Sequence, residues 1–409
     1  MSRQIARGAI VSILGGAALL AAVACASSPG GSSPGTVSPA GAPADDAGGF
    51  VVTLGRDTTV VERFTRTATR LEGALLRRAP TTTITRYSVE LDAAGRPTRM
   101  AFRTRRPDGS IPPGGAQSVT LTFAGDEIVR EIHRDTVIRT TGTVAGGSPY
   151  INDSFALYEL ALRRARAVGA DSSALAFLPV AAQRFALTPW PARFLSPTAA
   201  RVYYFGDPQQ VTLDAQGRIL AIDATGTTNK VRVARVPAID IDGLGASFAA
   251  REAAGNALAQ TTRDTVRTDV AGAELWIDYG RPVARGRVIF GAGGIVPDDV
   301  VWRTGANAAT QIRTSRDLDF GGTVVPAGFY SLYTLPAAGG RWQLIVNRAT
   351  GQWGTVYDQA QDLARIPLRV ESPSEPVERF TIAVEPQGNG GALTLTWSTT
   401  KLVAPFTVR

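Results

Sequence analysis

Apolar and polar residues alternate along much of this chain, with a period of two that suits a β-strand and not a helix. The alternation is clearest in three runs: RYSVEL (86–91), RMAFR (99–103) and VTLTF (119–123). Between the first two, Asp92-Ala93-Ala94-Gly95 places glycine where a hairpin needs a positive φ. We therefore predict antiparallel β structure over residues 50–236. The near copies LDAAGR at 91–96 and LDAQGR at 213–218 indicate a favoured turn used twice, or an internal repeat.

A single amphipathic helix interrupts these strands. Asn152 or Asp153 can cap its start, and Gly169 can end it. Its apolar stripe consists of Phe155, Tyr158, Leu162 and Ala165, and arginines lie toward its end: Arg163, Arg164 and Arg166. One helix among many strands predicts a curved antiparallel sheet with that helix packed against its concave face.

Residues 237–263 have the pattern of a helical connector. The start IDIDG at 239–243 is similar to a calcium loop, but the later ligands of an EF-hand are missing. We predict no metal here, and instead a helix over Ala246–Gln260 with Asp242 as its cap.

The C-terminal segment, residues 264–409, again predicts strands without a helix. Its apolar residues alternate in three runs: WQLIVN (342–347), FTIAV (380–384) and LTLTW (393–397). Six or more such strands predict a β-sandwich. The whole chain is thus expected to be mostly β. The roughly 360 residues from Phe50 onward are more than one core normally serves, so we expect two β bodies, the first at 50–236 and the second at 264–409.

Three sequence blocks recur in order in a known family. They are WRTGAN at 302–307, VPAG at 325–328 and GQWG at 351–354. With these blocks the segment resembles DUF2911, a family of bacterial exported proteins without an established activity. The resemblance covers about a third of the chain. It implies an export route and names no catalytic or ligand-binding residue.

The N-terminus carries an export signal. Arg3 and Arg7 precede an uncharged apolar run, and Ala22-Val23-Ala24 supplies the small residues of a cleavage site. We predict a signal peptide at 1–24 and acyl chains on Cys25, which place the protein on a bacterial membrane surface, outside the cytoplasm. Ordinary secretion, giving a soluble or periplasmic protein, is the alternative.

A tether is expected after the cleavage site. Residues 25–49 consist almost entirely of Ala, Ser, Pro, Gly, Thr and Asp, and cannot bury enough apolar surface to fold. Cys25 is the single cysteine of the chain, so the fold has no internal disulfide. The net charge of +8 comes from scattered arginines without interleaved aromatic residues. We therefore expect no nucleic-acid partner.

Loops of the C-terminal segment offer a candidate binding surface. Flat rings there could stack on a sugar or an aromatic ligand, and polar side chains beside them could donate and accept hydrogen bonds. The candidate residues are Trp302, Arg303, Asn307, Trp353, Tyr357 and Asp358. The competing interpretation is that these tryptophans are core residues and that Asn307 forms a turn.

The chain is poor in catalytic groups. His133 is its single histidine, no G-x-S-x-G motif is present, and a zinc site built from several histidines or cysteines is excluded. We expect no cofactor and no bound metal. We favour non-catalytic binding of a glycan, small molecule or envelope protein. Two alternatives are a hydrolase of envelope polysaccharide, using Asp298, Asp299, Asp317 and Asp319, and a lipid carrier formed by the first body.

Overall fold

The computed structural model describes residues 46–167, 172–182, 184–204, 206–237 and 239–409. The predicted signal peptide at 1–24, the lipid-attachment residue Cys25, and the predicted tether up to residue 45 lie outside the described residues. The predicted helix stop at Gly169 does too. None of the described helices is long and apolar enough to span a membrane.

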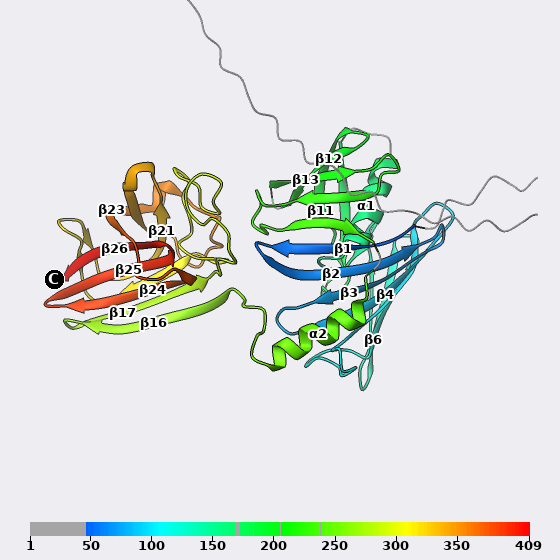
Figure 1. Cartoon of the computed structure of the whole chain (residues 1–409), viewed down its shortest axis with the longest axis horizontal. Helices are drawn as coiled ribbons and strands as arrows, with labels where there is room; N and C mark the ends of the chain where they lie inside the picture. The colour runs from blue at the N-terminus through cyan, green and yellow to red at the C-terminus, as the bar shows by residue number, and fades with distance from the viewer. Residues whose placement is uncertain (1–45, 168–171, 183, 205, 238) are drawn as a thin grey trace, which may run out of the picture. The chain divides into compact units, whose positions relative to one another are not determined.

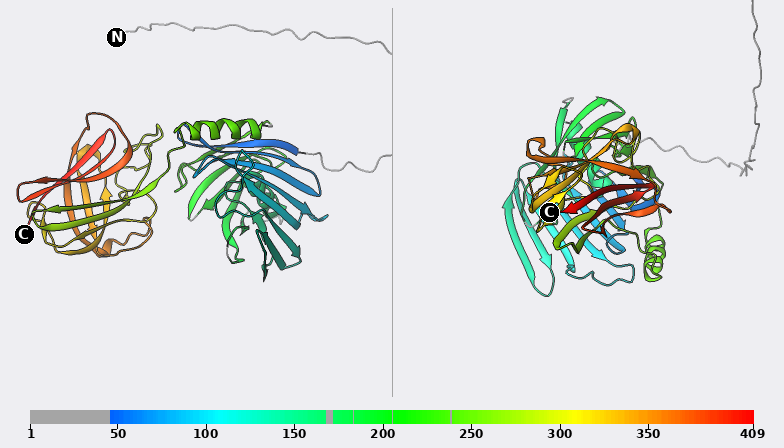
Figure 2. Two further views of the ribbon diagram at one scale, coloured as in Figure 1. Left: turned by 90° about the horizontal axis from the view of Figure 1, so that it is seen from below. Right: turned by 90° about the vertical axis from the view of Figure 1, so that its left-hand side faces the viewer.

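Fifteen strands of the described part form the first sheet, in the order β8-β7-β6-β5-β4-β3-β2-β1-β15-β14-β13-β12-β11-β10-β9. Their bounds are β1 (Asp46–Leu54), β2 (Asp57–Arg66), β3 (Arg70–Arg77), β4 (Thr83–Leu91), β5 (Pro97–Arg105), β6 (Ser118–Ala124), β7 (Glu127–His133), β8 (Val137–Thr143), β9 (Ser148–Tyr150), β10 (Ser172–Pro179), β11 (Thr188–Ser196), β12 (Ala199–Tyr204), β13 (Asp207–Leu213), β14 (Ile219–Asp223) and β15 (Arg232–Val236). Neighbours pair antiparallel except β9 and β10, which pair parallel. The sheet curves without closing (Figures 1 and 2).

Strand β1 begins earlier than the sequence suggests. Residues 46–49, which we expected in the tether, belong to β1 and pair with β2. Asp46 is buried there, between the guanidinium groups of Arg66 and Arg235. The small residues Ala47, Gly48 and Gly49 carry no apolar signal, so composition alone assigned them to the tether.

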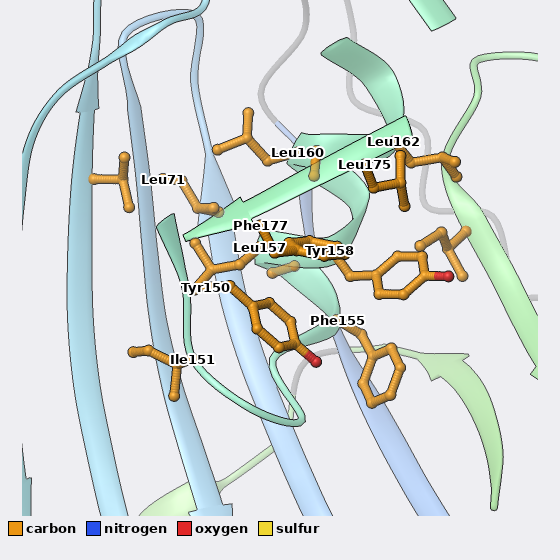
Figure 3. Packing of buried hydrophobic residues seen from close by; sticks show 14 of the residues in the cluster. Leu71, Tyr150, Ile151, Phe155, Leu157, Tyr158, Leu160, Leu162, Leu175 and Phe177 are labelled. Carbon is orange, nitrogen blue, oxygen red and sulfur yellow. The ribbon is translucent and has the colours of Figure 1, made fainter. Parts of the chain in front are cut away.

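Helix α1 (Phe155–Ala167) packs against the inner face of this sheet, as predicted (Figure 3). Its buried set is wider than the predicted stripe, because Leu157, Glu159 and Leu160 are buried as well. The predicted cap was wrong. Ser154 caps α1 instead, its hydroxyl accepting from the Leu157 amide at 3.3 Å, and the Glu62 carboxylate accepts from the next free amides.

Helix α2 (Ile241–Ala253) packs on the outer face of β2, β3 and β4 (Figure 1). Side chains alternate along β2, so this strand packs against a helix on each face of the sheet. Val60 faces the α1 core, and Val61 contacts the α2 cluster. The helix starts five residues before the predicted start. Asp240 caps it by accepting from the Gly243 amide at 3.0 Å, so the prediction of Asp242 as cap was wrong.

Residues 262–409 form a second β body with its own core. Its described strands are β16 (Thr262–Val270), β17 (Ala273–Arg281), β18 (Thr310–Thr314), β19 (Leu318–Asp319), β20 (Val324–Val325), β21 (Gly328–Leu335), β22 (Trp342–Asn347), β23 (Asp362–Glu371), β24 (Val377–Gln387), β25 (Gly390–Ser398) and β26 (Thr400–Val408). Two 3-10 turns, η1 (Ala338–Gly340) and η2 (Gln359–Gln361), are its helical segments within the described residues. Strand β23 joins two layers, because it pairs with β22 in one and with β26 in the other. The expected mostly-β fold with a C-terminal sandwich is confirmed.

Candidate functional site

Trp302, the first predicted binding residue, lies in an aromatic cluster. Its ring stacks on Trp397 with centroids 5.7 Å apart, and it meets Phe380 edge-on at 5.1 Å and Phe290 at 5.8 Å. Its backbone forms an isolated bridge with Thr334. These contacts give the ring a packing role.

Arg303, Asn307 and Trp353 lie on two loops that pair with each other. The Gly354 amide donates to the Asn307 carbonyl at 2.9 Å, and the side chain of Arg303 packs directly over Gly354. Asn307 is exposed with a φ of 66°, the left-handed conformation expected of a turn asparagine. Trp353 is 52% exposed, so its ring is open to solvent.

Tyr357 and Asp358 hold the segment around η2 together. The Tyr357 hydroxyl donates to Asp362 at 2.7 Å, and Arg365 donates to the same hydroxyl at 3.0 Å. Burial, followed by the bond to Asp362, raises the pKa of Tyr357 to about 12. Asp358 caps η2 by accepting from the Ala360 amide at 2.9 Å. The six predicted residues are thus divided among a core cluster, a loop pair and a capped turn.

Two of the four aspartates of the hydrolase hypothesis are engaged in turns. Asp317 accepts from the Ala327 amide at 2.8 Å. Asp319 accepts from the Gly322 amide at 2.6 Å and from Arg409, and these two bonds lower its pKa. Within the described residues, no group of three or more His, Cys, Asp or Glu is arranged to hold a metal ion.

A different surface of the second body combines aromatic rings with free cationic groups. Strand register places four side chains directly opposite one another across β16, β17, β18 and β21. They are Arg267, Trp276, Arg313 and Phe329, which we call the platform. The Trp276 and Phe329 rings reach over β18 to within 5.8 Å of each other, measured between centroids.

The platform remains accessible to a ligand. Phe329 is 45% exposed, and both guanidinium groups lack a hydrogen-bond or ion-pair partner within the described chain. A hollow of about 990 Å³ lies over these four side chains, and it is also lined by Thr268, Asp269, Glu274, Leu275 and Ser315. Cationic donors, carboxylate acceptors and two ring faces therefore meet on one surface.

Sequence reasoning missed the platform although a signal was present. In the run ELWIDY at 274–279, Leu275 and Ile277 are buried, so Trp276 between them must face the other side of β17. Glu274 and Asp278 lie on the same side of the strand as Trp276. A tryptophan that faces outward beside two carboxylates is unusual, because its side chain has so much apolar surface. The partners on β16, β18 and β21 could not be found this way, because strand register is not visible in the sequence.

Comparison with known proteins finds a family match over the segment that carries this surface. Residues 261–406 match DUF2911, described as a protein of unknown function. No curated protein matches the chain. Among solved structures, a DUF1089 family protein from Pseudomonas aeruginosa is similar at 14% sequence identity, over 40% of this chain and 89% of that chain. Its TM-score of 0.31 is too low to support any argument about fold or function.

The DUF2911 segment contains the whole platform. All four platform strands, β16, β17, β18 and β21, lie between residues 261 and 406. The blocks that carried the resemblance lie elsewhere in the same segment, in the loops around Arg303 and Trp353 and at the start of β21. The DUF2911 match thus confirms the resemblance seen in the sequence.

Proposed function

We propose that this protein is a cell-envelope lipoprotein that binds a glycan without catalysing its breakdown. Acyl chains on Cys25 hold it to the membrane surface, and the platform of the DUF2911 segment binds the glycan. The chemistry of the platform carries the proposal.

Sugar rings present two kinds of surface that the platform matches. Their C–H faces stack on aromatic rings, and Trp276 and Phe329 supply two such rings. Their hydroxyl groups both donate and accept hydrogen bonds. Arg267 and Arg313 can donate to them, and Asp269 and Glu274 in the same hollow can accept from them.

The sequence supports a location at the envelope. A signal peptide that ends before Cys25 would expose this residue for acylation, and residues 26–45 would form a flexible tether. A coil of this length spans about 25 Å on average, from the scaling of roughly 5–6 Å × √n. That reach lets a membrane-bound protein contact a polymer next to the membrane.

Both alternatives have less support. Two of the four aspartates of the hydrolase hypothesis, Asp317 and Asp319, are hydrogen-bonded within turns and so are not free carboxylates of the kind that the chemistry requires. The lipid-carrier hypothesis requires an open apolar interior in the first body. There α1 packs against β2, β9 and β10, and its side chains belong to one buried cluster with those of the strands (Figure 3).

Binding to purified envelope polysaccharide tests the proposal. We expect full-length protein with Cys25→Ser to bind insoluble peptidoglycan or an array of soluble glycans. The double variant Trp276→Ala/Phe329→Ala should bind at least about tenfold more weakly, equivalent to about 1.4 kcal/mol, because two stacking faces are lost.

The variant Trp353→Ala is the matched control, since it removes an exposed tryptophan of the DUF2911 segment that lies outside the platform. Unchanged binding by this control, with loss in the double variant, supports the platform. The reverse pattern would assign binding to the loops around Arg303 instead. Equal binding by all three proteins, or glycan cleavage by the parent protein, would contradict the proposal.

A further inference from the structure

Like charges lie next to each other on the outer face of the first sheet. Arg86 on β4 and Arg103 on β5 are directly opposite in the antiparallel register, and the same row continues through Ala74 to Arg63 on β2. Like charges at directly opposed positions destabilise a sheet unless another group neutralises them. Arg63 and Arg103 make no hydrogen bond or ion pair with the described residues.

Two further arginines surround this pair. A hollow of about 340 Å³ is lined by Arg86, Arg103, Arg105, Arg106 and Asp242. Arg105 is fixed by bonds to the carbonyls of Ala116 at 3.2 Å and Gln117 at 2.7 Å. The Nε of Arg106 is buried and has no hydrogen-bond partner among the described residues.

The acidic groups nearby leave an excess of positive charge. Asp242 on α2 bonds to Arg86 at 2.5 and 2.8 Å. Asp108 lies in the turn after β5, where it accepts from Ser110. The hollow itself is therefore lined by four arginines and by one carboxylate, that of Asp242. An adjoining hollow of about 390 Å³ shares Arg86 and is also lined by Arg63 on β2 and Glu72 on β3.

We infer that this arginine hollow binds a phosphate group. A phosphate offers several acceptor oxygens to planar guanidinium forks, which bind it in bidentate fashion. It would also neutralise the opposed pair Arg86 and Arg103. The hollow is too small for a large apolar ligand. Its arginines lie on β4 (Arg86), on β5 (Arg103 and Arg105) and directly after β5 (Arg106). The phosphate can be free or part of a lipid headgroup.

Titration of the full-length Cys25→Ser protein tests the inference, with inorganic phosphate in one arm. Vesicles of phosphatidylglycerol, compared with phosphatidylcholine, form the other arm. The double variant Arg103→Gln/Arg106→Gln should lose at least tenfold in affinity for whichever probe binds. The control Arg139→Gln/Arg201→Gln removes the same charge from strands outside the hollow and should stay within about twofold of the parent.

A second variant tests for a gain. Asp242→Asn frees Arg86 from its carboxylate, so it should strengthen binding severalfold. A merely damaged fold would not give this result.

Phosphate binding that the double variant loses assigns free phosphate as the ligand, and loss of vesicle binding alone assigns the headgroup. Binding of neither probe, or equal loss in the control, overturns the inference. The platform variant Trp276→Ala/Phe329→Ala should bind phosphate normally, which separates this site from the glycan site.

Discussion

Glu62 is fully buried on β2 and accepts four hydrogen bonds, three of them from the start of α1. Its Oε2 accepts from the amides of Phe155 at 2.7 Å and Ala156 at 3.0 Å. Its Oε1 accepts from the hydroxyls of Tyr87 and Ser154, both at 2.6 Å. A carboxylate from a distant strand thereby satisfies helix amides that lack partners within the helix. Burial nevertheless dominates and raises the pKa of Glu62 above its ordinary value of 4.5.

The raised pKa predicts how the stability contribution of Glu62 depends on pH. A carboxyl with a native pKa above its unfolded pKa contributes fully below the unfolded value, and this contribution is lost as pH rises through the native pKa. Relative to Glu62→Gln, the wild-type protein should therefore be most stabilised below about pH 4.5, with a smaller difference at neutral pH. Urea unfolding of both proteins across this range measures the effect.

The variant Glu131→Gln provides the control, because it removes a carboxyl from a partly exposed position on β7. Its difference from wild type corrects for the general effect of losing one acidic group. A wild-type advantage that grows with pH would contradict the prediction. It would mean that the four donors hold the native pKa low and outweigh burial.

Four other charged residues near α1 form a closed ring that no local pattern reveals. Arg66 bonds to Glu159 at 2.6 Å and to Asp46, and Arg235 bonds to Glu159 at 3.0 Å and to Asp46 at 2.7 Å. Removing one member would leave buried charges unpaired, which costs far more than losing an exposed pair. These residues lie up to 189 positions apart. The sequence could therefore not predict the ring. The ring does explain why a glutamate can be buried in α1.

Elements with local signals could be predicted, and those defined by distant contacts could not. The strand from Tyr87 to Leu91 and its turn at Gly95 follow from alternation and a positive φ. The pairing of β1 with β15, or of β9 with β10, depends on residues far apart in the chain. The same limit applies to the site, because Trp276 could be seen to face outward while its neighbours across the sheet could not.

Strand β3 provides a test at the scale of an element. Gly73 is paired with Tyr87 on β4, and the tyrosine ring lies directly over the glycine. A methyl group at Gly73 would collide with that ring. Gly73→Ala should therefore displace Tyr87, weaken its bond to Glu62, and lower the free energy of unfolding by about 1–3 kcal/mol.

Gly226→Ala is the matched control, since an added Cβ there meets open space and the backbone needs no positive φ. Its unfolding free energy should stay within about 0.5 kcal/mol of wild type. Thermal or urea unfolding compares the two variants. Equal stability of Gly73→Ala and wild type would show that the ring can move without cost and that its position is not fixed by packing.

At the scale of the whole molecule, two β bodies with separate cores follow one N-terminal segment. The first body contributes the arginine hollow and the second contributes the platform. Both binding proposals assume that the protein meets its ligands at the envelope. A soluble cytoplasmic protein with the same folds would meet neither a peptidoglycan layer nor an outward-facing membrane. The location of the protein therefore decides whether either surface can meet its ligand.

Acylation of Cys25 is the prediction that tests this location. In cells, the mature wild-type protein should begin at Cys25, carry acyl chains by mass spectrometry, and sediment with the membrane fraction. Cys25→Ser should remove the acyl mass and move most of the protein to the soluble fraction, because one residue supplies the anchor. Ser27→Ala, two residues on, should partition like wild type. An unacylated mature start at Cys25, or a stable uncut precursor in the cytoplasm, would contradict the prediction.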